Sequence, residues 1–142
     1  MLFLETNDHN SLCEFYRENG LEVSDDIFAD DGAFFSIKCV ENGKTIAAAT
    51  LSRRFGVYII DYVATSPDHR KKGLGEKAVT VVKACAKQRG ADKLYITAKN
   101  PAFFKKIGFQ NGSPKGVDMN IDCIGCPEYN KGCQKLPMYI DL

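Results

Sequence analysis

The segment of this sequence best suited to chemistry is residues 63–75, where a hydrophobic strand-like run passes through a basic turn into a helical pattern. Gly73 and Gly75 allow the backbone to approach a ligand closely and to adopt positive φ without strain. The first N–H groups of a helix have no acceptor inside it, and together with the helix dipole they attract anions. Four basic residues surround the turn: Arg70, Lys71, Lys72 and Lys77. We therefore expect a diphosphate group to bind here.

Two familiar phosphate-binding motifs do not fit this segment. The dinucleotide-binding pattern G-x-G-x-x-G would need a third glycine where the chain has Ala78. The P-loop pattern G-x-x-x-x-G-K-[S/T] occurs nowhere in the chain. A purely structural alternative stays open, in which the two glycines only begin a helix after a basic turn.

Two motifs in the right order resemble those of one enzyme family. The spacing Pro67-x-x-Arg70-x-x-Gly73-x-Gly75 resembles the pyrophosphate-binding motif of the GNAT acetyltransferases. Residues 100–109, NPAFFKKIGF, resemble that family's second landmark, a short helix that ends in Gly-Phe. The resemblance covers residues 44–142 well and the N-terminal third loosely. Residues 103–109 followed by Cys123, Cys126 and Cys133 also look like the small bacterial amino-acid N-acetyltransferases related to N-acetylglutamate synthase.

The resemblance implies an N-acetyltransferase that moves an acetyl group from acetyl-CoA to a primary amine of a small molecule, such as an amino acid or a polyamine, or of a peptide. A non-catalytic sensor of CoA esters with the same fold is the alternative. The family positions that contact the cofactor match these residues: Val63, Ala64, Thr65, Arg70, Lys71, Lys72, Gly73, Leu74, Gly75, Glu76, Asn100 and Phe104. The alternative is that Val63 is only a core residue and that Asn100 is only a turn residue before Pro101.

The catalytic residues match the family less well than the cofactor loop does. Family members often use a Tyr as the acid where this chain has Phe104, and a Glu as the base where it has Ile59. Asp61 lies two positions after Ile59 and is expected on the same strand face, which makes it our candidate general base. A plain surface aspartate is the alternative, and transfer can also proceed by positioning with water as the proton relay. His69 is expected to be simply exposed.

The expected fold is a mixed α/β (α+β) domain that places these residues. Residues 2–4, 33–40, 45–51, 57–65, 94–97 and 138–140 read as strands, and residues 8–19, 74–89 and 101–107 as helices. Asn42-Gly43 predicts a tight hairpin turn, and Ser11 with Glu14 predicts a capping box. The resemblance adds a central, mostly antiparallel, twisted sheet with a splayed strand pair and flanking helices.

Length and composition narrow the functional class. The chain has 142 residues, which fits one domain, and its formal charge is +1, which favours neither a nucleic-acid nor a membrane partner. No signal peptide or membrane span is evident, so we expect a cytoplasmic protein with reduced cysteines. A structural zinc site needs four ligands, and the C-terminal region supplies three cysteines, so no metal is expected. The acidic residues 25–31 would suit a cationic acceptor.

Overall fold

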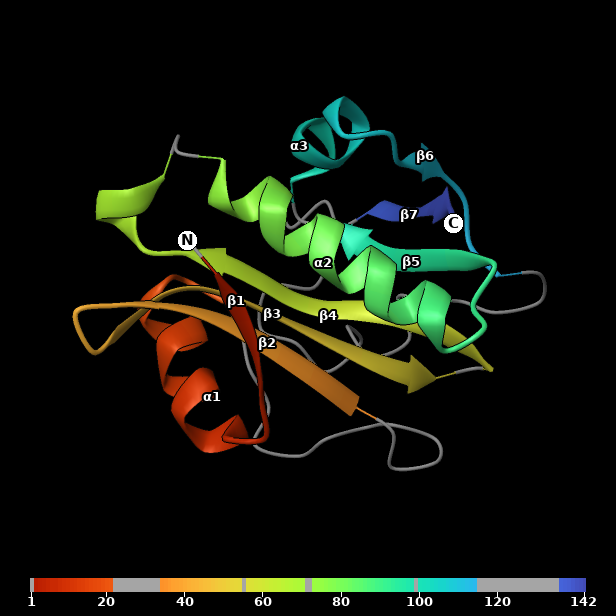
Figure 1. Cartoon of the computed structure of the whole chain (residues 1–142). Coiled ribbons are helices and arrows are strands. Elements are labelled where there is room, and N and C mark those ends of the chain that lie inside the picture. Colours follow the sequence, from red (N-terminus) through yellow and green to blue (C-terminus); the bar gives the residue numbers. More distant parts are fainter. Residues whose placement is uncertain (1, 22–33, 55, 71–72, 99, 115–135) are drawn as a thin grey trace.

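Seven strands form the centre of the protein in our computed structural model, which describes residues 2–21, 34–54, 56–70, 73–98, 100–114 and 136–142. The strands are β1 (Phe3–Thr6), β2 (Phe34–Glu41), β3 (Lys44–Arg54), β4 (Val57–Thr65), β5 (Lys93–Ala98), β6 (Gln110–Asn111) and β7 (Leu136–Asp141). They form one sheet in the order β1-β2-β3-β4-β5-β7-β6. Only β4 and β5 pair in parallel, and their arrows point the same way in Figure 1. The predicted mixed, mostly antiparallel sheet is confirmed.

The hairpin between β2 and β3 follows directly from its sequence. Asn42 and Gly43 have φ values of 52° and 78°, which is the geometry of the primed turns that join two twisted strands tightly. Short polar or absent side chains tolerate that conformation, and the predicted turn is therefore confirmed.

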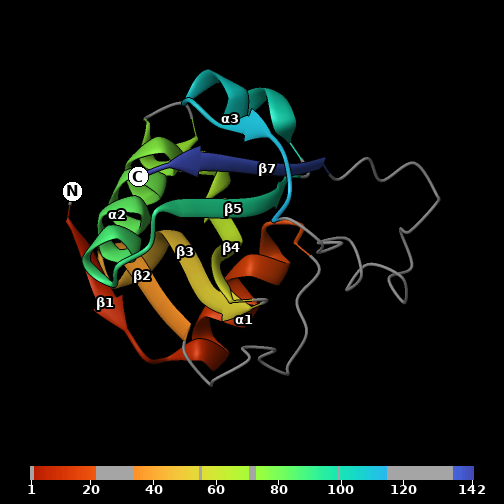
Figure 2. The same ribbon diagram turned by 90° about the vertical axis from the view of Figure 1, so that its right-hand side faces the viewer.

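Helices cover both faces of the sheet: α1 (His9–Glu18), α2 (Leu74–Gln88) and the short α3 (Pro101–Lys106). Figure 2 shows α2 and α1 on opposite sides of the strands. Three consecutive alanines in β3 let both helices pack closely, because Ala47 and Ala49 pack on the α2 side and Ala48 packs with α1. Within the described ranges, no helix is both long and apolar enough to cross a membrane.

The helix α1 begins where the sequence predicts, but its N-terminal cap differs from the predicted one. The N-cap is Asp8, whose side-chain Oδ1 accepts a hydrogen bond from the Ser11 N–H at 3.2 Å. The predicted capping box of Ser11 and Glu14 is therefore wrong. Asp is as good an N-cap as Ser, and its position three residues earlier starts the helix one turn sooner than a cap at Ser11 would.

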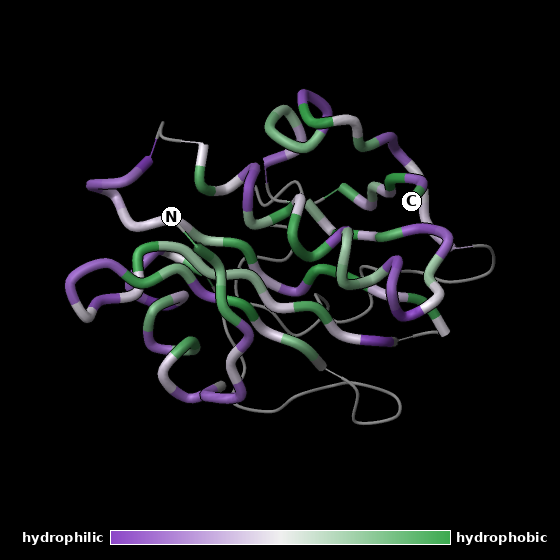
Figure 3. Tube along the Cα trace, viewed as in Figure 1, coloured by the Kyte–Doolittle hydropathy of each residue, from purple (hydrophilic) through white to green (hydrophobic). Residues whose placement is uncertain are grey.

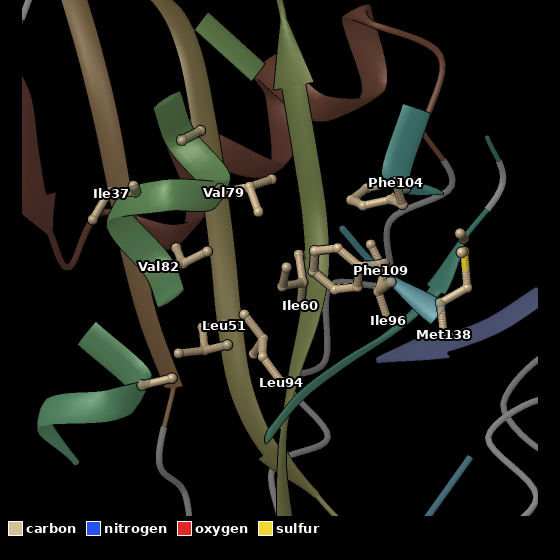
Figure 4. Close-up of a cluster of buried hydrophobic side chains, with 14 of the residues drawn as sticks. Ile37, Leu51, Ile60, Val79, Val82, Leu94, Ile96, Phe104, Phe109 and Met138 are labelled. Carbon is tan, nitrogen blue, oxygen red and sulfur yellow. The ribbon is translucent and has the colours of Figure 1, made fainter. Parts of the chain in front are cut away.

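The main core lies between α2 and the sheet and continues under α3. Figure 4 shows Val79 and Val82 of α2 facing Leu51, Ile60 and Leu94, with Phe104, Phe109 and Met138 completing the cluster. Figure 3 shows that the hydrophobic segments concentrate in the central strands, whereas the segment after β4 is hydrophilic. Burial of the apolar face therefore leaves that polar segment at the rim of the sheet.

A chain of buried hydroxyl groups crosses the opposite face of the sheet. The Tyr16 hydroxyl lies 2.8 Å from Thr50 Oγ1, which in turn lies 3.0 Å from Ser36 Oγ. Burial, with a smaller contribution from the negative charge of Asp61, raises the pKa of Tyr16, so this hydroxyl stays protonated. Ser52 lies two positions after Thr50 and is equally buried, but its Oγ has no hydrogen-bond partner among the described residues.

Thr50 and Ser52 provide a matched pair for measuring the value of this chain. Thr50→Val keeps the shape but deprives both Tyr16 and Ser36 of their partner, so we expect it to lower the free energy of unfolding by about 2 kcal/mol. Ser52→Ala removes an unsatisfied hydroxyl and should change that free energy by less than about 0.5 kcal/mol or raise it. Urea denaturation of both variants checks this, and equal losses would contradict it.

Candidate functional site

The site begins where β4 separates from its neighbour. The parallel ladder joins Tyr58, Ile59 and Ile60 to residues 94–96 of β5 and extends no further among the described residues. From Val63 to Thr65, the only strand that pairs with β4 among the described residues is β3. Backbone groups that would face β5 in a continuous sheet can therefore bind another partner, because backbone N–H and C=O groups need one.

The loop after β4 is held in place by backbone hydrogen bonds. The Ser66 N–H donates to Ile46 O at 2.8 Å, and a short 3-10 turn, η1 (Pro67–His69), follows. The Arg70 side chain folds back, with Nε donating to Thr65 O at 3.3 Å. These contacts hold residues 66–70, the described part of the loop that follows β4, and Arg70 is the last of them.

Gly73 is the N-cap of α2 and explains how the helix begins. Its φ is 75°, in the left-handed region that favours glycine, and it supplies no side-chain cap. Within α2 the Lys77 N–H donates to Gly73 O at 3.0 Å. The three preceding amides, of residues 74–76, have no acceptor within the helix because they belong to its first turn. These amides suit a bound anion.

A cavity of ≈ 560 Å³ lies along this helix start. It connects the loop and α2 with β4, with the end of α1 and with α3. Its lining contains Asn19, Leu21, Val63, Ala64, Thr65, His69, Arg70, Gly73, Leu74, Gly75, Glu76, Asn100, Phe103, Lys106 and Ile107. Nine of the positions predicted to bind cofactor are in this set, contributed by β4, the loop, α2 and the N-cap of α3. Lys71 and Lys72 lie outside the described residues.

Gly75 is the point at which three elements meet most closely. A Cβ at this position would lie 3.4 Å from a Phe103 ring carbon and 3.7 Å from Thr65 Oγ1. These are ordinary van der Waals distances, so a Cβ would fit here, in contact with both α3 and β4. Glycine lets the start of α2 pack against Phe103, which forms one wall of the cavity.

Phe104, predicted to contact the cofactor, packs elsewhere. Its side chain is 6% exposed and makes edge-on ring contacts with Phe103 and Phe109, at centroid distances of 5.0 and 5.4 Å. Figure 4 shows it pointing into the core near Ile60. The cavity is lined instead by Phe103, which sequence reasoning missed. Adjacent residues of a helix point about 100° apart, so only one of the two aromatic rings can face the cavity.

Asp61 occupies an irregular position in β4. Thr50 pairs with Tyr62 and Leu51 with Ile60, so Asp61 is the extra residue of a β-bulge. In a regular strand, residues two positions apart point to the same face. Ile60 and Tyr62 pack on opposite faces of the sheet, so the bulge at Asp61 breaks this alternation. Burial is the main cause that raises the pKa of Tyr16 in α1, and the negative charge of Asp61 adds to it. The Asp61 carboxylate therefore lies near α1. Asp61 is half-buried and is not among the residues that line the cavity.

His69 is more constrained than expected. Its Nδ1 lies 2.7 Å from Ser66 Oγ and its Nε2 lies 2.6 Å from Glu41 Oε2. The side chain is 17% exposed and lines the cavity, so the expectation of a simply exposed histidine is wrong. The sequence carried no signal for this contact, because Glu41 lies 28 residues earlier on another strand.

Two features of the sequence analysis lie in parts of the chain that the structure does not describe. The acidic residues 25–31 lie outside the described residues, as do Cys123, Cys126 and Cys133. In the part of the chain that is described, no group of three or more His, Cys, Asp or Glu side chains is arranged to hold a metal ion.

A curated relative shares part of this sequence. An uncharacterised N-acetyltransferase of Chlorobaculum tepidum is 26% identical over 78 residues, which cover 54% of this chain and 50% of that protein. The chain thus spans about half the length of this curated relative.

Two solved structures share the fold. A GNAT-family acetyltransferase from Staphylococcus aureus Mu50 has a TM-score of 0.73 at 13% identity, covering 99% of this chain and 98% of that one. N-acetylglutamate synthase from Neisseria gonorrhoeae, complexed with coenzyme A and N-acetyl-glutamate, has a TM-score of 0.71 at 18% identity. That match covers all of this chain but 35% of the synthase. The acetyltransferase (GNAT) family model itself matches residues 3–109, three quarters of the sequence, and the chain therefore belongs to this family.

Proposed function

We propose that this protein transfers the acetyl group of acetyl-CoA to a primary amine. The single observation that carries the proposal is the cavity, which brings the amides at the start of α2, the unpaired side of β4 and the N-cap of α3 to one place. A diphosphate needs the amides at the start of α2. An extended chain with amide groups needs the backbone of β4. Acetyl-CoA supplies both, as one molecule.

The cofactor is held mainly by backbone groups in this proposal. The diphosphate binds at the amides of residues 74–76, and Arg70 adds positive charge at the mouth of the loop. The pantetheine arm pairs with the β4 backbone around Val63 and Thr65. Asn100 lies close by as the N-cap of α3, and its side chain makes no capping hydrogen bond of its own. Lys106 provides a second cation in the cavity wall.

Chemistry takes place beyond the end of the pantetheine arm, on the α1 side of β4. A neutral amine nitrogen attacks the thioester carbonyl, a C–N bond forms, the C–S bond breaks, and the thiolate takes a proton. Asp61 is the proposed base that removes the proton from the incoming amine. Phe104 does not protonate the thiolate, because its side chain has no ionisable group and is buried in the core. Solvent water is sufficient for that step.

The proposed acceptors are free amino acids, polyamines and short peptides. Incubation of the purified chain with acetyl-CoA and a panel of these amines, with release of free CoA as the readout, tests the activity. Mass spectrometry of the acetylated product identifies the acceptor. Acetyl-CoA binding without release of CoA above background for any amine would contradict the enzymatic proposal and favour a sensor of CoA esters.

A further inference from the structure

Three side chains form a hydrogen-bonded chain from the cofactor loop to the hairpin between β2 and β3. Ser66 and His69 belong to the loop, and Glu41 is the last residue of β2. The two distances in this chain, 2.7 Å and 2.6 Å, are short for hydrogen bonds to a ring nitrogen. The loop is thereby attached to β2 as well as to β3, whose Ile46 O accepts the Ser66 N–H.

Chemistry determines the direction of these hydrogen bonds. An ionised carboxylate can only accept, so His69 Nε2 carries a proton and donates it to Glu41. The Ser66 hydroxyl can donate to Nδ1 when the ring is neutral and accept from it when the ring is protonated. The chain therefore keeps the same geometry in both states, and only its net charge changes.

That net charge matters because of where the chain lies. With a protonated imidazole the His69–Glu41 pair is neutral, whereas with a neutral imidazole the carboxylate charge is left uncompensated at the edge of the cavity. Of the described residues, the other charged side chains in the cavity lining are Arg70, Glu76 and Lys106, and Asp68 lies in η1 next to His69. An anionic cofactor is repelled by the uncompensated carboxylate.

We propose that His69 is a positioning residue for the acyl donor, and that it acts in its protonated form by holding the loop to Glu41 while neutralising that carboxylate. This inference rests on the proposed binding of acetyl-CoA at the same loop. It predicts that the donor binds more tightly at low pH, because binding of an anion favours the protonated imidazole. It also predicts opposite effects for the two partners, since His69 supplies the positive charge and Glu41 the negative one.

Equilibrium dissociation constants for acetyl-CoA, measured by calorimetry at about pH 5.5 and about pH 8.5, on either side of the range in which histidines usually titrate, test the inference. The wild-type affinity should fall about fivefold at the higher pH, the size expected for one partly exposed charge. His69→Gln should bind about as weakly at both pH values as the wild type does at the higher one. Glu41→Gln keeps an acceptor for Nε2 but lacks the charge, so at the higher pH it should bind more tightly than the wild type.

Glu14→Gln is the matched control, because it causes the same change of net charge from an exposed position on α1 outside the cavity lining. It should follow the wild type at both pH values. Titration of the acetyl-CoA phosphates changes the dissociation constant equally for every variant. Differences between variants therefore report the effect of the protein side chains. Thermal melting checks that each variant folds. If His69→Gln does not fold, the affinity of Glu41→Gln at the higher pH tests the inference by itself.

The outcomes separate this inference from the proposed function. Absence of acetyl-CoA binding by the wild type would refute the proposed function itself. Binding by the wild type with identical behaviour of His69→Gln would overturn the inference alone. Weaker binding by Glu41→Gln than by the wild type at the higher pH would also overturn the inference. That result is expected if the hydrogen bonds between Ser66, His69 and Glu41 only hold the loop in position.

Discussion

Gly73→Asp should weaken acetyl-CoA binding by at least about tenfold, which corresponds to roughly 1.4 kcal/mol. The new carboxylate would lie at the start of α2, where the proposed diphosphate meets the free amides of the first turn. The residue also has a φ of 75°, which a side chain adopts at some cost. Apart from the two chain neighbours, no atom of the described residues lies within 4 Å of the added Cβ, so the loss should come from charge and backbone strain rather than from a clash in the unliganded protein.

Two control variants separate these causes. Gly73→Asn has nearly the same shape without the charge, and Asn is the side chain that tolerates the left-handed region best after glycine. Gly90→Asp introduces the same strain at the far end of α2, where φ is 87° and the added Cβ also meets nothing within 4 Å. Both should bind acetyl-CoA more tightly than Gly73→Asp. A Gly73→Asp protein that folds and binds like the wild type would show that the diphosphate lies elsewhere.

Asp61→Asn should lower turnover by about 10² to 10⁴, the usual contribution of a general base, while changing acetyl-CoA affinity little. The bulge at this position places the carboxylate away from the regular alternation of β4, on the side of α1 and Tyr16. Bulges often direct a side chain beside an active site in this way. Steady-state kinetics with the best acceptor, across pH, measures the effect, because loss of a base removes the dependence of the rate on its ionisation.

Asp92→Asn, an exposed aspartate before β5, is the control for a general effect of charge. It should leave turnover close to the wild-type value. A wild-type rate and pH profile for Asp61→Asn, together with a changed melting temperature, would make Asp61 a structural residue and leave proton removal to water or to the substrate.

Much of this fold was predictable from local patterns in the sequence. The bounds of β4 were predicted to the residue, because a run rich in β-branched and aromatic residues lies between Gly56 and Pro67. The helix α2 was predicted to within one residue, because its helical periodicity stops before Gly90. The hairpin at Asn42 and Gly43 needed only its own two residues. The prediction of an anion site at the loop also rests on local chemistry alone, namely a helix start, glycines and basic neighbours.

Other features were decided by contacts between distant segments. The β-bulge at Asp61 depends on how β3 and β4 align, and no property of β4 alone predicts where a ladder shifts register. Phe103 and Phe104 are chemically identical, so only the orientation of α3 on the sheet decides that one lines the cavity and the other fills the core. The contact of His69 with Glu41 requires the β2–β3 hairpin to lie beside the cofactor loop, because the sequence separates the two residues by 28 positions. Sequence thus determined where an anion could bind, and tertiary structure decided which side chains surround it.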